Sequence, residues 1–154
     1  DEALKDFNKY SNSEYDYILI DCPPALGILT LNALTAADSV LVPLQCEFFA
    51  LEGLSQLMKT VEMVRLTFNP NLKLEGIILT MFDKRNNLSE QVAEDARKNL
   101  GSTVFNTVIP RNVRISEAPS HGIPALVYDY KCSGSVAYMN LAKEFIERES
   151  SFVQ

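Results

Sequence analysis

The sequence has 154 residues, which is the length of one domain and enough to bury a hydrophobic core. Its formal net charge of −6 argues against nucleic-acid binding through bulk positive charge, although a local basic patch could still act. Hydrophobic residues make up 47% and charged residues 22%, as in an ordinary soluble globular protein. No apolar run approaches the roughly 18 residues of a membrane span and no signal peptide opens the sequence, so we expect a protein that is neither membrane-spanning nor secreted.

Hydrophobic periodicity and turn residues divide the chain into alternating helices and strands. The expected elements are, in chain order, an amphipathic helix ending near Tyr10, a strand over Asp16–Asp21, a helix over Leu29–Ala37, a strand over Ser39–Pro43, a helix over Phe49–Phe68, a strand over Leu74–Met81, a helix over Glu90–Leu100, a strand over Val104–Ile109 and a helix over Ser133–Arg148. Ser89 is predicted to cap the helix that follows it, Gly101 to end that helix, and residues 110–122 to form a loop.

This alternation predicts an α/β fold. Strands joined by helices and short connections form right-handed crossovers, which give a parallel sheet with flanking helices. No internal repeat or linker divides the sequence, so residues 1–154 are expected to form one domain or part of one. The cysteines Cys22, Cys46 and Cys132 contain no C-x-x-C pair, which favours reduced structural thiols over ligands of a cluster.

Asp21 is the most informative single residue. It follows the apolar run Ile18–Ile20, and Pro23 and Pro24 stop strand pairing just beyond it. A carboxylate at the carboxyl end of a buried strand lies where open α/β sheets bind ligands. A hydrophobic strand that closes on Asp is the Walker B arrangement, which holds Mg²⁺ directly or through water. A strand-end Asp can also be a structural cap, and both interpretations remain open at this point.

Longer motifs point to a family. They are Asp21–Gly27, Asn32–Asp38, Val42–Leu54, Leu79–Arg85 and Val108–Gly122. In this order, and over nearly the whole chain, they closely resemble the ParA/Soj chromosome- and plasmid-partitioning ATPases, relatives of MinD and of the nitrogenase iron protein. The resemblance implies a P-loop NTPase domain of the MinD/ParA type with a deviant Walker A loop.

One part of that domain has no counterpart in this sequence. The six glycines are isolated, and none is followed by Lys-Ser or Lys-Thr, whereas the relatives carry a glycine-rich phosphate loop roughly a hundred residues before the stretch that matches Tyr15. The resemblance therefore implies that residues 1–154 are the C-terminal part of a single ATPase domain, expected to be inactive alone. It also implies that Asp21 organises Mg²⁺ through water and that Cys22, Pro23, Pro24 and Gly27 belong to the second switch, although Gly27 could be only a turn residue.

The base of ATP or ADP is expected at two strand ends. The strands ending at Met81 and at Ile109 reach the same edge of the sheet as Asp21, so the loops after them can reach one ligand. In relatives the Pro-Arg-Asn segment wraps the adenine, which implies that role for Pro110, Arg111 and Asn112, with Met81 as a packing surface. Pro110 can at the same time be a strand terminator.

Arg85 and Arg114 are candidates for DNA contact. An exposed arginine is usually only solvated surface. In the family, however, arginines at these two motif positions contact DNA nonspecifically once ATP has produced the homodimer. The resemblance further implies weak ATP hydrolysis stimulated by a ParB-like centromere-binding protein, and a cytoplasmic location on the nucleoid.

Two other functions compete with partitioning. A MinD-like cell-division-site ATPase binds membranes through a basic amphipathic C-terminal helix, whereas this sequence ends in an acidic, short segment over residues 147–154, so no membrane partner is expected. A non-catalytic α/β regulatory module with a phosphorylated strand-end Asp would need an acidic pair on an earlier strand, for which the sequence has no room. It would also leave the motif over residues 110–122 unexplained.

Overall fold

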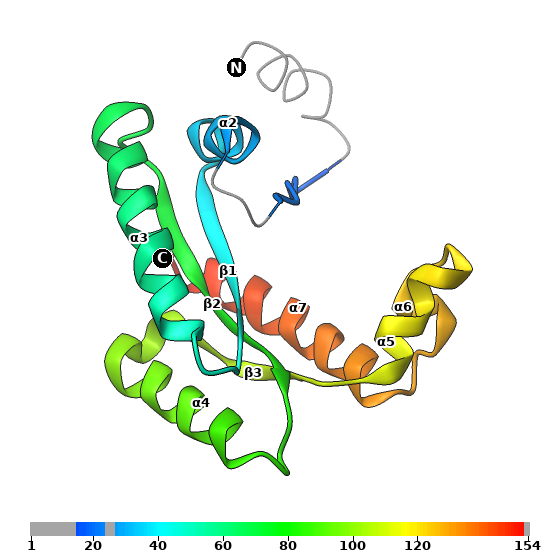
Figure 1. The fold of residues 1–154 in the computed structure, drawn as a ribbon. Coiled ribbons are helices and arrows are strands. Elements are labelled where there is room, and N and C mark those ends of the chain that lie inside the picture. Colours follow the sequence, from blue (N-terminus) through cyan, green and yellow to red (C-terminus); the bar gives the residue numbers. More distant parts are fainter. Residues whose placement is uncertain (1–14, 24–26, 153–154) are drawn as a thin grey trace. The chain divides into compact units, whose positions relative to one another are not determined.

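The computed structural model describes residues 15–23 and 27–152 (Figure 1). Contacts between residues divide this part of the chain into two compact units: unit 1 comprises residues 15–23, 27–40 and 54–75, and unit 2 comprises residues 41–53 and 76–152. The elements, in chain order, are α2 (Ile28–Ala36), β1 (Ser39–Gln45), α3 (Ala50–Thr67), β2 (Lys73–Phe82), α4 (Asn87–Leu100), the 3₁₀ turn η1 (Gly101–Thr103), β3 (Val104–Pro110), α5 (Val113–Glu117), the 3₁₀ turn η2 (Ala118–His121), α6 (Ala125–Tyr128) and α7 (Ser133–Phe152). The predicted helix ending near Tyr10 lies outside the described residues.

The three strands form one sheet in the order β1-β2-β3. β2 and β3 are parallel, with Ile77 opposite Val104 and Phe82 opposite Pro110. β1 is parallel to β2. Near the start of both strands the Lys73 N–H donates to the Asp38 carbonyl, and near their ends the Cys46 N–H donates to the Thr80 carbonyl. The predicted parallel α/β architecture is confirmed, and the carboxyl ends of all three strands lie at one edge.

Unit 1 is held together by packing of α2 against α3. Its core is a cluster of aliphatic side chains, namely Leu34, Val61, Val64 and Leu72. Asn69, just after α3, donates from Nδ2 to the carbonyls of Leu34 at 3.1 Å and Ala37 at 2.8 Å. Since the last carbonyls of a helix have no partner within it, Asn69 supplies the partners that end α2 and ties the two helices together.

The predicted strand over Asp16–Asp21 is wrong. Residues 15–23 form no strand, and the side chains of Ile18, Leu19 and Ile20 are 43%, 84% and 41% exposed. An apolar run becomes a strand only when a neighbouring strand pairs with its N–H and C=O groups. In the described part of the chain no strand pairs with this segment.

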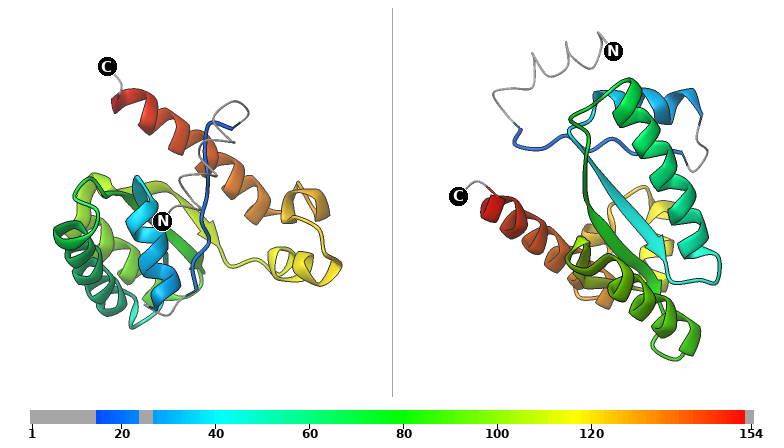
Figure 2. Two further views of the ribbon diagram at one scale, coloured as in Figure 1. Left: turned by 90° about the horizontal axis from the view of Figure 1, so that it is seen from above. Right: turned by 90° about the vertical axis from the view of Figure 1, so that its left-hand side faces the viewer.

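Unit 2 packs helices against β3. Its core cluster consists of Ile78, Phe105, Ile109 and Leu141, with Leu41, Ala137 and Phe145 packed against it. Both α4 and α7 contact β3. Figure 2 shows the same helices from two further directions. The rings of Phe105 and Phe145 stack with centroids 6.5 Å apart, so the amphipathic face of α7 covers the sheet as its periodicity predicts.

The start of α4 differs from the prediction. The cap is Asn86, whose side chain accepts a hydrogen bond from the Leu88 N–H at 3.0 Å. Ser89 is instead buried inside the first turn and donates from Oγ to the Cys46 carbonyl at 3.1 Å. The end of α4 is as predicted, because Gly101 adopts φ +56°, a conformation that favours glycine.

The predicted loop over residues 110–122 is largely helical. It contains α5 and η2 and ends at Gly122, which has φ +65°. Asn112 caps α5 by accepting hydrogen bonds from the N–H groups of Arg114 at 2.9 Å and Ile115 at 3.4 Å. Short helices of four or five residues give too little periodicity to be recognised from sequence, which also explains why α6 was not predicted.

Candidate functional site

The carboxyl ends of the strands are joined by hydrogen bonds in unit 2. The Cys46 N–H, just after β1, donates to the Thr80 carbonyl on β2 at 3.0 Å. The Arg111 N–H, just after β3, donates to the Phe82 carbonyl at 2.9 Å. The loops that follow the three strands therefore begin side by side, at the edge where open α/β sheets bind ligands.

Three of the four candidate base-binding residues come together at this edge. Pro110 lies opposite Phe82 in the sheet, which makes Met81 its close neighbour, and Arg111 is bonded to Phe82. Met81 has φ +52°, the single positive φ outside glycine in the described part of the chain. Such a backbone conformation costs roughly 1–2 kcal/mol and is concentrated at functional sites. Met81 and Pro110 are both half-buried apolar residues at this edge, and each leaves part of its surface open to solvent.

Asn112, the fourth candidate, uses its side chain within the protein. Its Oδ1 caps α5, and its Nδ2 donates to Ser133 Oγ at 2.9 Å at the start of α7. A Cβ added at Gly134 would lie 3.2 Å from the Asn112 Cβ, so the turn fits closely against α7. Asn112 therefore shapes the loop after β3, with its Oδ1 and one Nδ2 hydrogen already bonded within the protein.

Glu47 and Asp83 also lie at this edge, and neither was predicted from the sequence. Glu47 Oε1 accepts from an Nη of Arg111 at 3.2 Å, an ion pair that joins the loops after β1 and β3. A groove of about 540 Å³ lies here, lined by Cys46, Glu47, Phe48, Asp83, Asn86, Leu88, Ser89 and Arg111. Their positions in the sequence could have indicated this, because Glu47 and Asp83 come two residues and one residue after the ends of β1 and β2. Asp21 was expected at a strand end for the same reason.

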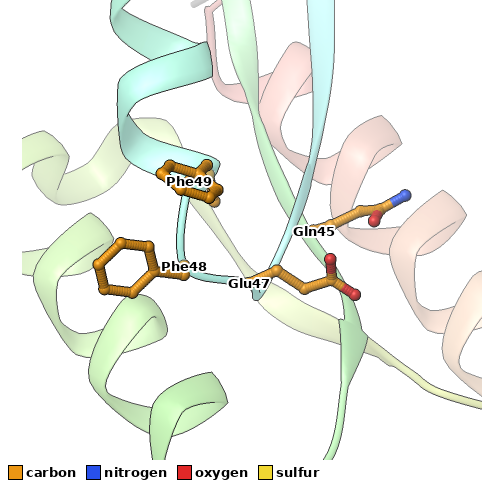
Figure 3. Close-up of a pocket in the computed structure, with 5 residues that line it drawn as sticks. Gln45, Glu47, Phe48 and Phe49 are labelled. Carbon is orange, nitrogen blue, oxygen red and sulfur yellow. The ribbon is translucent and has the colours of Figure 1, made fainter.

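The loop after β1 exposes two aromatic rings. Phe48 and Phe49 are 73% and 72% exposed and meet edge to face with centroids 5.0 Å apart. Figure 3 shows the rings on one side of the loop and the side chains of Gln45 and Glu47 on the other. Together with Ala50 these residues line a hollow of about 300 Å³.

Arg85 is paired with Asp83. Its Nε and an Nη donate to the two carboxylate oxygens at 3.0 and 2.9 Å, and its backbone N–H donates to Oδ1 at 3.0 Å. These hydrogen bonds from Arg85, helped by the charges of Arg85 and Arg111, hold the pKa of Asp83 at about 2.

Arg114 is paired with acidic residues as well. An Nη donates to Glu117 Oε2 at 3.1 Å, and Nε lies 3.8 Å from Asp129 Oδ2. The Tyr128 hydroxyl donates to the same Glu117 oxygen at 3.2 Å. Hydrogen bonding to Glu117 raises the pKa of Arg114, so this guanidinium, like that of Arg85, is charged and held in place.

The candidate magnesium and switch residues belong to unit 1. Asp21 is exposed, and Cys22 donates from Sγ to the Ile20 carbonyl at 3.7 Å. Gly27 is the residue before α2, with φ −96° and nothing within 4 Å of an added Cβ, so its backbone does not require glycine. Thr30 Oγ1 lies 3.5 Å from the Pro23 carbonyl. Pro24 lies outside the described residues.

Comparison with known proteins decides the family. A profile described as "AAA domain" matches residues 1–74. The chromosome partitioning protein ParA of Caulobacter vibrioides is 63% identical over 139 residues, which cover 90% of this chain and 52% of that protein. The sporulation initiation inhibitor protein Soj of Bacillus subtilis is 58% identical over 130 residues, covering 84% and 51% respectively. The chain is a homologue of the ParA and Soj proteins.

Two solved structures share the fold of this chain. Cobyrinic acid a,c-diamide synthase from Mycobacterium smegmatis, with bound ATP analog and magnesium, matches with a TM-score of 0.75 and 36% identity over 97% of this chain and 54% of that one. The Pyrococcus furiosus cell division ATPase MinD matches with a TM-score of 0.73 and 25% identity over 94% and 57%. The chain spans about half the length of the relatives it matches.

Metal ligands and membrane spans can be assessed for residues 15–23 and 27–152 alone. Within these ranges the chain contains no group of three or more His, Cys, Asp or Glu side chains able to hold a metal ion together. Within the same ranges no helix has the length and hydropathy needed to cross a membrane.

Proposed function

We propose that this chain is the C-terminal part of a single ParA-type ATPase domain, which in the complete protein partitions chromosomes or plasmids by an ATP-dependent mechanism. One observation carries the proposal: 63% identity to a chromosome partitioning protein over 90% of the chain. The strand ends support it, because they gather loops at the edge where this fold class binds ligands. The complete protein would bind ATP and hydrolyse it weakly. Residues 1–154 alone would not, because their glycines form no phosphate-binding loop.

Asp21 suits Mg²⁺ chemically. Asp21 is exposed, so its carboxylate oxygens are accessible. The described residues contain no group of three or more metal-binding side chains, so phosphate oxygens and water would supply the other ligands of the ion. Mg²⁺ usually keeps several waters and takes one or two carboxylates plus phosphate oxygens, so a single Asp is a sufficient protein contribution. When bound, the ion would neutralise charge on the phosphates. The role of Asp21 is to orient it, directly or through water, beside the switch residues Cys22, Pro23, Pro24 and Gly27.

Met81, Pro110 and Arg111 suit the adenine of ATP or ADP. Met81 and Pro110 provide half-buried apolar surface, and Arg111 is fixed at the same edge by Glu47 and by its backbone bond to Phe82. Base sites combine apolar packing with a few placed polar groups. Asn112 contributes by shaping the loop, since its side chain already bonds Ser133 and the α5 N-terminus.

Arg85 and Arg114 would contact DNA phosphates without regard to sequence. Their side chains are 88% and 56% exposed, and Arg is the side chain best suited to phosphate. In the complete protein ATP would drive formation of a homodimer that presents these arginines from both copies. A ParB-like centromere-binding protein would stimulate hydrolysis, and the protein would act in the cytoplasm, on the nucleoid.

The MinD-like alternative has weaker support. The MinD structure is 25% identical to this chain, against 63% for the partitioning protein. The two proposals differ in partner, because a MinD-like protein binds membrane and a partitioning protein binds DNA.

Steady-state hydrolysis by the complete protein tests the proposal. The expected result is slow ATP turnover that rises when DNA and the ParB-like protein encoded with it are added. Asp21→Ala should abolish turnover while leaving the thermal unfolding midpoint unchanged, since it removes an exposed metal-orienting carboxylate. Turnover that responds to anionic vesicles and not to DNA would favour the MinD-like alternative, and turnover unaffected by Asp21→Ala would refute the role of Asp21.

A further inference from the structure

The pairing of Arg85 with Asp83 leaves the guanidinium facing solvent. Asp83 receives three hydrogen bonds from Arg85, two from the guanidinium and one from the backbone. The Asp83 side chain is 23% exposed, whereas the Arg85 side chain is 88% exposed. A guanidinium has five N–H groups, so the two used by Asp83 leave three on the outward side.

Arg114 repeats this arrangement on another loop. Glu117, three residues further on, accepts from Arg114 at 3.1 Å, and the Tyr128 hydroxyl donates to the same oxygen at 3.2 Å. Tyr128 thereby fixes Glu117, as the backbone of Arg85 fixes Asp83. Asp129 lies 3.8 Å from Arg114 on a second side. Both arginines are thus held by carboxylates that have a second attachment of their own.

We propose that Asp83 and Glu117 are positioning residues that hold Arg85 and Arg114 ready to receive the phosphates of a DNA backbone. The inference rests on the proposed function, since it assigns how the two arginines are presented. A free arginine side chain loses considerable rotamer freedom when it binds a phosphate. Because Asp83 and Glu117 order these side chains before DNA binds, less side-chain conformational entropy is lost on binding.

A carboxylate beside a phosphate also repels it, which works in the opposite direction. At an exposed site water weakens this repulsion, but a phosphate bound to the same guanidinium would lie too close to the carboxylate for salt to screen it. We expect the gain from ordering the side chain to exceed this repulsion, so that each carboxylate strengthens DNA binding although it offsets the formal charge of its arginine.

The test is DNA affinity of the complete protein with ATP and Mg²⁺, measured by fluorescence anisotropy on a duplex of random sequence. Asp83→Asn and Glu117→Gln should each weaken binding roughly two- to tenfold, the factor expected for ordering one long side chain at binding. Glu90→Gln is the matched control, because it removes an exposed carboxylate from the first turn of α4, where no arginine of the described residues forms an ion pair with it. This control should not weaken binding. Asp83→Asn should cause no further loss of DNA affinity when Arg85→Ala is already present. If Asp83 had only a general structural role, the two losses would add.

The outcomes separate the two levels of the proposal. If Arg85→Ala and Arg114→Ala weaken binding but Asp83→Asn and Glu117→Gln tighten it or leave it unchanged, the positioning role is overturned and the DNA-binding function stands. If neither arginine substitution changes affinity, the proposed DNA contact itself is overturned. Thermal unfolding identifies a variant that fails to fold, and should Asp83→Asn do so by disturbing its turn, Glu117→Gln decides the question.

Discussion

Glu144 and Arg148 form an ion pair of 2.7 Å on α7 that closes the free edge of β3. The Glu144 carboxylate also accepts the backbone N–H groups of Asn106 and Thr107 at 2.7 and 2.8 Å. Arg148 in turn donates to the Val104 carbonyl at 3.0 Å and lies over the Phe105 ring. An edge strand presents unpaired backbone groups to solvent, and here two side chains take the place of a further strand.

Glu144→Ala should therefore destabilise the protein by about 1–3 kcal/mol, because it leaves two backbone N–H groups without their acceptor and removes the charged partner of Arg148. The free energy of unfolding, measured in urea, checks this. Asn140→Ala, at an exposed position of α7, is the control and should change stability by less than about 0.5 kcal/mol. Equal effects of the two substitutions would contradict the assigned role.

The same contacts predict a pH dependence. Burial raises the pKa of Glu144, but hydrogen bonds from Thr107, Asn106 and Arg148 outweigh it and hold the pKa below its ordinary value of 4.5. Because the folded state binds this proton less tightly than the unfolded state, the stabilisation is complete above the unfolded pKa and is lost as the pH falls through the folded pKa. The stability difference between wild type and Glu144→Gln should thus be constant from pH 7 to about 5 and shrink below 4.5. A difference that stays constant to pH 3 would be inconsistent with this pairing.

Gly76 is predicted to tolerate no side chain. A Cβ added there would overlap the Phe105 ring and lie 2.9 Å from the Thr103 carbonyl oxygen, so Gly76→Ala should cost about 1–3 kcal/mol of stability. Gly53→Ala is the matched control, since this glycine lies within α3 with nothing within 4 Å of the added Cβ. Alanine there should stabilise by roughly 0.5–1 kcal/mol. Urea unfolding of both variants distinguishes crowding from a general effect of replacing glycine.

Most of the fold could be predicted from the sequence because long periodic segments carry their own signal. The helix over Phe49–Phe68 and the strand over Leu74–Met81 appear as α3 and β2 within one residue at each end. The segment over Asp16–Asp21 failed for a physical reason: apolarity indicates that a run prefers burial, whereas strand formation also requires a neighbour to pair with. The cap at Asn86 was missed because Asn and Ser are both preferred N-cap residues, and Ser89 lies within the first turn of the helix.

The site was predictable where it depends on strand ends and not where it depends on side-chain pairing. Met81 and Pro110 lie at the same edge because Phe82, the residue after Met81, pairs with Pro110 on an adjacent parallel strand, an arrangement that alternation of elements already implies. The pairing of Glu47 with Arg111 joins residues 64 apart in sequence, and no local pattern encodes such a contact. The hydrogen bond from Asn112 to Ser133 is not encoded locally either, because it depends on the packing of α5 against α7.

Arg114→Ala should weaken DNA binding of the complete ATP-bound protein similarly on all sequences. The slope of log affinity against log salt should fall in magnitude by about one, as for loss of one phosphate contact. Arg65→Ala is the control, because Arg65 makes an i,i+3 pair with Glu62 of the same kind on α3. If both substitutions, or neither, change the salt slope, Arg114 has no special role in DNA binding.

The most direct test of the account is the affinity of the complete protein for random-sequence DNA with ATP and Mg²⁺ compared with ADP and Mg²⁺, measured over a series of salt concentrations. The account predicts tighter binding in the ATP state, steep weakening as salt rises, and loss of affinity in the Arg85→Ala, Arg114→Ala double variant. Equal affinity in the ATP and ADP states, or binding that the double variant leaves unchanged, would contradict it.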